Sequence, residues 1–412
     1  MKTRSKILMS YLMTVLMLSS GLLFYSCESE DEVGGVPGVE RIRPVDPERA
    51  DEALESVGLG ENVAIVGENL RSVKEIYVNG YKTFFSPTMA TNTHLVFTIS
   101  DETPTVATSQ DVPNEITLVS DDGEVNYSIN VLPPKPEVQA ISNEMAKAGE
   151  TLTITGKYFF FLEEVVFPGG VTVTDMEHSA DGTSITVTVP DGITQPGTIT
   201  VTSQSGTGTL SPMYRFNDPT GIFNDFDDLN FFAPWGPQPV LGSSNPAPID
   251  GNYVRVTGTE VPSPMWWNNA QVIPMSGFTW PVTSGDASEY ALKFEMNTPV
   301  AWKSGWFEWT LGWTYFYRLK PWDVNPDEEY WEISGTRTPT PENEWITVVV
   351  PLNKFRLKPG GAPDGAPIAN LSDLAGKDIV MAFQNPGEED GGLPIPELHI
   401  CMDNFRLVKI TE

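Results

Sequence analysis

The sequence predicts an all-β chain of two tandem immunoglobulin-like sandwiches followed by a larger jelly-roll-like β-sandwich. Many short runs alternate between β-branched or aromatic residues and polar ones, which is the period of a half-buried strand. The 412 residues include 35 glycines and 35 prolines, more than average usage, as expected for strands joined by turns. A set of strand motifs also occurs twice in the same order. These three observations carry the prediction.

Residues 1–26 are predicted to be a signal peptide and not part of the fold. A basic start with Lys2, Arg4 and Lys6 precedes a long apolar run that ends at Ser26-Cys27. A small residue directly before a cysteine at this point resembles a bacterial lipobox, which implies cleavage before Cys27 and lipidation of its side chain. An ordinary secretory signal or a signal anchor is the alternative.

Residues 27–35 are predicted to be an acidic leader. The sequence ESEDE directly after Cys27 resembles the signal that sends lipoproteins of Bacteroidota to the outside of the outer membrane. This implies a surface-exposed, lipid-anchored protein of the cell outer membrane. The only other cysteine is Cys401, so a lipidated Cys27 leaves no pair for a disulfide. No other run reaches the ~18 apolar residues of a membrane span.

The excess of acidic over basic residues excludes some classes of binding partner. The formal net charge is −30, and it becomes −33 without residues 1–26, because three basic and no acidic residues are removed. Nucleic acids and anionic lipid surfaces both require basic patches, so neither is expected as a partner. A solvated, negatively charged surface outside the cell fits a neutral ligand.

Residues 36–132 and 134–217 are predicted to be the two smaller sandwiches. The stretch VAIVGENLRSVKEIYVNG at 63–80 corresponds to LTITGKYFFFLEEVVFPG at 152–169, which is 89 residues further along. A repeat of roughly 90 residues built of short strands has the size of one immunoglobulin-like domain. The strand–glycine–strand pattern resembles the IPT/TIG domains. We interpret the pair as a stalk, with ligand binding by one of the repeats as the alternative.

Residues 218–412 are predicted to be one larger β-sandwich. All eleven tryptophans of the chain lie between Trp235 and Trp345. Strands are legible in the alternating residues 290–296 and in the β-branched run 344–352. The motifs FDDL and MDNFRL, near the two ends of the segment, resemble those of carbohydrate-binding jelly rolls. The two repeats contain no tryptophan, so only this segment concentrates this large aromatic side chain.

The chain as a whole resembles a surface glycan-binding protein, of the xyloglucan-binding type, from a Bacteroidota polysaccharide-utilisation locus. The resemblance rests on the lipoprotein signal, the acidic leader, the tandem IPT/TIG repeats and the tryptophan-rich terminal sandwich. It implies a non-catalytic lipoprotein that binds a plant cell-wall β-glucan such as xyloglucan and needs no cofactor. It also implies neighbouring surface hydrolases and glycan-uptake proteins as partners.

Flat aromatic side chains with a polar tip are suited to stacking on sugar rings. In AWKSGWFEWTLGWTYF, residues 301–316, strand alternation places Trp309 and Trp313 on the core side and Trp306 on the outer side. We therefore expect Trp302 and Trp306 to belong to a glycan-binding platform. Trp309 and Trp313 are expected to be structural.

Two further segments supply candidate glycan-binding residues. Trp266 and Trp267 stand beside two asparagines in PMWWNNA, and asparagine amides suit sugar hydroxyls. Only one of these two tryptophans could face the ligand if the segment is extended. Trp322, Tyr330 and Trp331 lie among acidic and turn residues in PWDVNPDEEYWEISG, where a core role is hard to explain.

Enzyme motifs are scarce. The three histidines lie one in each module, and the sequence has no GxSxG elbow and no P-loop. Paired carboxylates could support glycoside hydrolysis, but 55 acidic residues make such pairs unavoidable by chance. An endo-acting glycoside hydrolase and a protein-adhesion or scaffold module are the two alternatives to a glycan-binding protein. No metal ligand is assigned; a structural calcium ion at Asp225, Asp227 or Asp403 is weighed against a solvated acidic turn.

Overall fold

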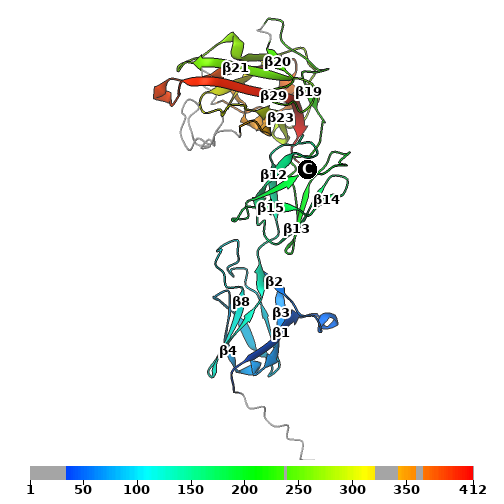
Figure 1. The fold of residues 1–412 in the computed structure, drawn as a ribbon, viewed down its shortest axis with the longest axis vertical. Helices are drawn as coiled ribbons and strands as arrows, with labels where there is room; N and C mark the ends of the chain where they lie inside the picture. The colour runs from blue at the N-terminus through cyan, green and yellow to red at the C-terminus, as the bar shows by residue number, and fades with distance from the viewer. Residues whose placement is uncertain (1–33, 236–238, 321–341, 359–364, 412) are drawn as a thin grey trace, which may run out of the picture. The chain divides into compact units, whose positions relative to one another are not determined.

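β-Strands and short 3-10 helices make up the regular structure of the described residues, which confirms the all-β class (Figure 1). The computed structural model describes residues 34–235, 239–320, 342–358 and 365–411. Over these ranges, none of the helices has the length and apolar character needed to cross a membrane. The chain divides into two compact units, one ending at Pro134 and the other beginning at Lys135.

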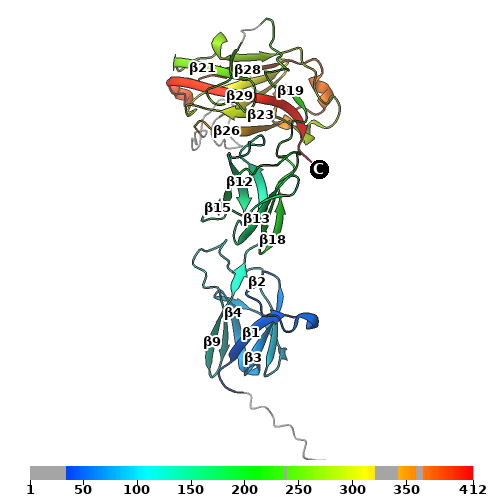
Figure 2. The same ribbon diagram turned by 45° about the vertical axis from the view of Figure 1, so that its right-hand side comes forward.

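The first unit is a sandwich of two four-stranded sheets around a core of valine, isoleucine, leucine and phenylalanine side chains. A short parallel pair, β2 (Ser56–Gly58) and β10 (Asn130–Leu132), is added to it. One sheet has the order β1 (Gly38–Pro44), β3 (Asn62–Glu68), β7 (His94–Thr98) and β6 (Phe85–Ala90). The other has the order β5 (Tyr81–Thr83), β4 (Val73–Val78), β8 (Glu115–Ser120) and β9 (Gly123–Ser128). Figure 2 shows the strands from a second side.

The second unit begins with a sandwich of the same plan, which has its own core. Its first sheet has the order β11 (Glu137–Ile141), β12 (Thr151–Lys157), β16 (Ser184–Thr188) and β15 (Met176–His178). Its second sheet has the order β14 (Val171–Val173), β13 (Leu162–Phe167), β17 (Thr200–Ser203) and β18 (Gly206–Thr209).

The repeated glycine of the two motifs has the same steric cause in both sandwiches. A Cβ on Gly67 would lie 1.9 Å from the carbonyl oxygen of Gly38, and one on Gly156 would lie 1.9 Å from that of Glu137. In each case the strand pairing shifts register at this point. A β-bulge that brings two backbones this close accepts only glycine. The sequence repeat is therefore a repeat of structure.

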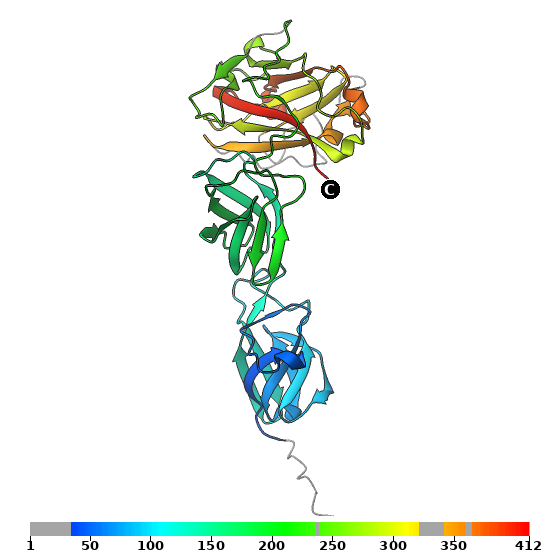
Figure 3. The ribbon, with the colours of Figure 1, turned by 90° about the vertical axis from the view of Figure 1, so that its right-hand side faces the viewer.

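The C-terminal domain of the second unit packs two larger sheets face to face. The first has the order β20 (Val240–Gly242), β21 (Tyr253–Val261), β29 (Ile395–Lys409), β23 (Tyr290–Asn297) and β26 (Trp345–Pro351), with β19 (Ile222–Asn224) also paired to β29. The second has the order β22 (Val272–Met275), β28 (Ile379–Gln384), β24 (Trp306–Leu311), β25 (Tyr315–Leu319) and β27 (Arg356–Leu357). Figure 3 shows β29, in red, running across this domain.

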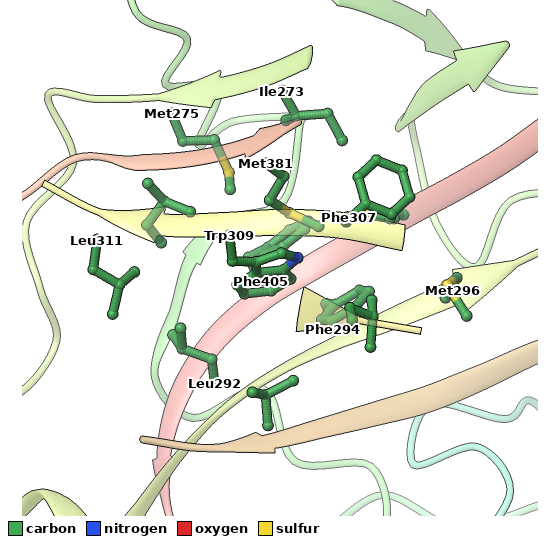
Figure 4. Close-up of a cluster of buried hydrophobic side chains, with 14 of the residues drawn as sticks. Ile273, Met275, Leu292, Phe294, Met296, Phe307, Trp309, Leu311, Met381 and Phe405 are labelled. Carbon is green, nitrogen blue, oxygen red and sulfur yellow. The ribbon is translucent and has the colours of Figure 1, made fainter. Parts of the chain in front are cut away.

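Aromatic side chains from both sheets meet in the core of the C-terminal domain (Figure 4). Phe294 of β23 and Phe405 of β29 stack with ring centroids 4.9 Å apart. Trp309 of β24 approaches them from the other sheet, at 5.4 Å and 6.0 Å. Trp309 is fully buried, so the expectation that it is structural is confirmed.

A buried ionic network joins the second sandwich to the C-terminal domain. Glu144, which follows β11, receives Lys293 Nζ at 2.6 Å and Arg406 Nη2 at 2.7 Å. Arg406 also forms two bonds of 2.7 Å to Glu295. The four side chains are at most 3% exposed. Thr347 of β26 adds a hydroxyl that accepts from the Glu144 amide at 2.7 Å. These two parts of the second unit therefore share an interface whose charges are internally compensated.

Candidate functional site

The candidate site lies on the face of the second sheet that points away from the core. Along β24, Phe307, Trp309 and Leu311 belong to the core cluster. The alternate side chains therefore point to the opposite side of the sheet. We call this opposite side the outer face, and it is formed by Trp306, Glu308 and Thr310 of β24, Phe316 and Arg318 of β25, and Ala382 and Gln384 of β28.

Trp306 is the aromatic centre of the outer face. The guanidinium carbon of Arg318 lies 3.7 Å from the centroid of its ring, which is a close cation–π contact. Its indole Nε1 donates to Oε1 of Gln384 at 3.0 Å, across the β24–β28 pair. The ring is thereby fixed in one orientation by a cation and by a hydrogen bond at its edge.

Charged groups continue along the outer face from Trp306. Glu308 stands opposite Arg318 in the β24–β25 register, with 3.6 Å between its carboxylate and Nη2. Lys358 Nζ lies 3.5 Å from the same carboxylate and 4.4 Å from the centroid of the Phe316 ring. Carboxylate oxygens accept hydrogen bonds, whereas guanidinium and ammonium groups donate them. Glu308 and Arg318 are buried, at 9% and 5% exposure, so these groups support the face from within.

Trp266 extends the outer face to solvent. Met265 and Asn385 exchange two backbone hydrogen bonds, of 2.7 Å and 2.8 Å, at the end of β28. This pairing brings the Trp266 ring centroid to 6.4 Å from that of Trp306, at an interplanar angle of 54°. Trp266 is 46% exposed. It therefore supplies an accessible aromatic surface next to the buried one.

Trp267 is also solvent-accessible, at 47%. Its Nε1 donates to Oδ1 of Asn269 at 2.9 Å, and Oδ1 of Asn268 accepts from the Ala270 amide. The two asparagines beside these tryptophans thus already have partners within their own segment. Trp266, by contrast, lies against Trp306, so the structure brings Trp266 and Trp306 together.

The structure corrects three expectations about the 301–316 stretch, of which those for Trp302 and Trp306 are the first two. Trp302 is only 2% exposed, packs against Phe307 and Phe383, and donates from Nε1 to the Ser304 carbonyl at 2.7 Å. It is a core residue and not part of a platform. Gly305, at φ 77°, lies before the start of β24 and breaks the alternation that links Trp302 to Trp306. Trp306 does face away from the core, but it is fully buried and not exposed.

Trp313 also differs from its prediction. It was expected to face the core, yet 54% of it is exposed. β24 ends at Leu311, and Trp313 lies in the turn before β25, so strand alternation does not extend to it. Trp322, Tyr330 and Trp331 lie outside the described residues, as does Cys27, so their assignments stay predictions.

The three acids considered for calcium have different environments. Asp225 accepts from the backbone amides of Asp227 and Leu229, and Asp227 accepts from Asn252. Asp403 is fully buried, and burial raises its pKa to about 9, a shift to which Asp250, Glu295 and Asp227 add. In the part of the chain that the structure describes, no group of three or more His, Cys, Asp or Glu side chains could hold a metal ion. A structural calcium ion at these residues stays a prediction.

Sequence reasoning missed Arg318, Gln384 and Lys358. Charged side chains within alternating, mostly apolar strands were the available signal, because Glu308 and Arg318 both interrupt such runs. The pairing of β25 and β28 with β24 was not visible in the sequence. Without that register, no pattern places these three side chains beside Trp306.

The C-terminal domain is a jelly-roll-like sandwich with aromatic and hydrogen-bonding side chains on one sheet face. Residues 216–409 match the family model described as the surface glycan-binding protein B xyloglucan binding domain. The matched segment contains every strand of both large sheets. The predicted resemblance to surface glycan-binding proteins is confirmed.

One curated relative aligns with more than half of the chain. An IPT/TIG domain-containing protein of Bacteroides ovatus is 24% identical over 251 residues, which are 58% of this chain and 47% of the relative. The chain thus spans about half the length of this curated relative.

Two solved structures share the fold. The surface glycan-binding protein PbSGBP-B of Prevotella bryantii is 22% identical with a TM-score of 0.59, covering 92% of this chain and 100% of that one. SGBP-B from a complex xyloglucan utilization locus in Bacteroides uniformis is 20% identical with a TM-score of 0.50, covering 91% and 99%. At these identities the likeness concerns the fold.

Proposed function

We propose that this protein is a non-catalytic surface glycan-binding protein whose C-terminal domain binds a plant β-glucan, with xyloglucan as its ligand. The observation that carries the proposal is the exposed ring of Trp266 beside the Trp306–Arg318 pair. The family of residues 216–409 supports xyloglucan as the glycan.

The chemistry of the outer face suits a neutral sugar chain. Trp266 offers a flat, solvent-accessible apolar surface for the C–H face of a pyranose ring. Because stacking and a few hydrogen bonds to solvated hydroxyls leave a small net free energy, we expect modest affinity at the site.

The arrangement of charges favours binding over hydrolysis. Glycosidases use two carboxyl groups, roughly 5 to 9.5 Å apart, on either side of the bond that is cleaved. Among the described residues of the outer face, Glu308 is the one carboxylate, and it lies between Arg318 and Lys358.

The proposal also includes the location of the protein in the cell. The apolar N-terminal run, Cys27 and the acidic leader support a lipid anchor and exposure at the outer surface of the cell outer membrane. Surface hydrolases and glycan-uptake proteins would then act on or import the captured chain.

Affinity electrophoresis of residues 27–412 tests this function. Gels that contain xyloglucan, mixed-linkage glucan, glucomannan or laminarin would be compared, with Trp266→Ala as the matched variant. We expect xyloglucan to retard the wild type and to retard the variant less. A wild type that migrates freely in all four gels would contradict the proposal. Release of reducing ends during long incubation would instead support the hydrolase alternative.

A further inference from the structure

Trp313 occupies an unusual position at the tip of the β24–β25 hairpin. Leu311, the last residue of β24, pairs with Tyr315, the first residue of β25. The Thr314 amide donates to the Leu311 carbonyl at 3.1 Å. The two central residues of this turn, Gly312 and Trp313, have φ angles of 58° and 56°. Turns with two left-handed residues favour asparagine and glycine. A tryptophan there is a strained choice.

The exposure of Trp313 adds a second cost. Its side chain is 54% exposed, which leaves a large apolar area in water. Backbone conformation and hydration both favour a smaller residue at this position. Trp313 combines a strained backbone conformation with an exposed aromatic ring, and this combination indicates that the residue serves a function other than folding.

The hairpin tip continues the strand that carries the outer face. Trp306, Glu308 and Thr310 follow one another along β24, and Trp313 comes three residues after Thr310. At about 3.4 Å per residue, the Cα atoms of Trp306 and Trp313 are at most roughly 24 Å apart. A long, extended polysaccharide can span such a distance, whereas an oligosaccharide shorter than the separation cannot contact both ends.

Hydrogen-bonding groups surround the tip. Lys377 Nζ donates to Thr314 Oγ1 at 3.0 Å, and the Lys377 stem is the first group that a Cβ on Gly312 would meet. A hydroxyl and an ammonium group therefore stand at the two residues that flank Trp313 in the turn. Lys377 Nζ also lies 5.9 Å from the centroid of the Tyr315 ring, the first residue of β25.

We propose that Trp313 is a distal stacking platform for the same glycan chain that binds at Trp266. The proposal rests on the proposed function and adds a dependence on ligand length. A long β-glucan contacts both ends of β24, whereas a short one contacts only the Trp266 end.

The test compares two ligands on two proteins. Calorimetry would measure Kd for a xylogluco-oligosaccharide of a single backbone repeat and for polymeric xyloglucan, with residues 27–412 as wild type and as Trp313→Gly. Glycine suits the left-handed turn, so the variant should unfold at the same or a higher temperature. We expect Kd for the polymer to rise about three- to tenfold and Kd for the single repeat to stay unchanged. Phe84→Ala removes an 85% exposed aromatic side chain from the first unit and should change neither Kd.

Three results would overturn the proposal. Unchanged polymer binding by Trp313→Gly would show that the ring does not contact the glycan, even if it binds a partner protein. Equal weakening for both ligands would place Trp313 at the Trp266 end or indicate a general disturbance. A wild type that binds neither ligand would remove the proposed function, and the length dependence with it.

Discussion

The guanidinium carbon of Arg318 lies 3.7 Å from the centroid of the Trp306 ring. The indole Nε1 donates to Gln384 on the opposite neighbouring strand. A buried tryptophan on the outer side of a sheet is thus fixed from both sides, and the exposed Trp266 ring lies against it. We interpret this group as a preorganised support, in which Trp306 and Arg318 hold the surface that Trp266 presents to the ligand.

Replacing Arg318 by lysine tests the planar contact separately from the charge. Lysine keeps a cation near Glu308 but lacks the flat guanidinium that stacks on an indole and forms forked hydrogen bonds. We expect Arg318→Lys to weaken xyloglucan binding about tenfold, or ~1.4 kcal/mol. Calorimetry measures this change, and thermal unfolding controls for the fold. Affinity equal to that of the wild type would show that the cation alone is sufficient.

Trp266→Ala should separate binding from stability. Because the side chain is 46% exposed, its loss should change the free energy of unfolding by less than ~1 kcal/mol. Binding of xyloglucan should fall about tenfold, since an accessible stacking surface is removed. Phe84→Ala, an equally drastic change at an exposed aromatic residue of the first unit, serves as the control. Similar affinities for both variants would exclude Trp266 from the site.

Glu144→Ala should destabilise the second unit. The substitution leaves Lys293 without its 2.6 Å partner and removes one of the two carboxylates that compensate Arg406. Breaking a buried ion pair by removing one partner costs about 3–5 kcal/mol. Denaturant unfolding measures the loss. Glu177→Ala, at an exposed acid on β15, should stay within about 0.5 kcal/mol of the wild type. A similarly small effect at Glu144 would mean that the two domains barely depend on the network.

The raised pKa of Asp403 predicts how the free energy of unfolding depends on pH. Burial raises its pKa in the folded state to about 9, so the folded protein keeps a proton that the unfolded chain releases near pH 4. Stability should therefore fall as pH rises between these values, by about 1.4 kcal/mol per pH unit for this one proton. Asp403→Asn stays neutral throughout. The stability of the variant relative to the wild type should thus increase from pH 5 to pH 8.

Chemical denaturation at several pH values measures that difference. Comparing variant with wild type cancels the contribution of other titrating groups such as His399, whose pKa is lowered by burial. Parallel stability curves for the two proteins would show that Asp403 is ionised in the folded state.

Much of the fold was predictable because it depends on local patterns. Alternation identified strands such as β23, and the glycines Gly67 and Gly156 marked the same bulge in two repeats. The site was harder to predict, because a face is built from residues of different strands. Alternation within β24 correctly separated Trp306 from Trp309, since both lie inside one uninterrupted strand.

The same rule did not hold where the strand ends. Gly305 and Gly312, both with positive φ, limit β24 to six residues and disconnect Trp302 and Trp313 from its alternation. Burial of Trp306 could not be predicted either, because Arg318 reaches it from a neighbouring strand. Register between strands is a tertiary property, and sequence periodicity alone does not encode it.

Hydroxyl-radical footprinting of residues 27–412, with and without xyloglucan, tests the central claim most directly. It reports side-chain accessibility at every exposed aromatic residue and methionine in one measurement. We predict that xyloglucan lowers oxidation of Trp266, on the C-terminal domain, and leaves Phe84 and Met89 of the first unit unchanged. Protection of Phe84 and Met89 with undiminished oxidation of Trp266 would contradict the assignment of the glycan site to the outer face.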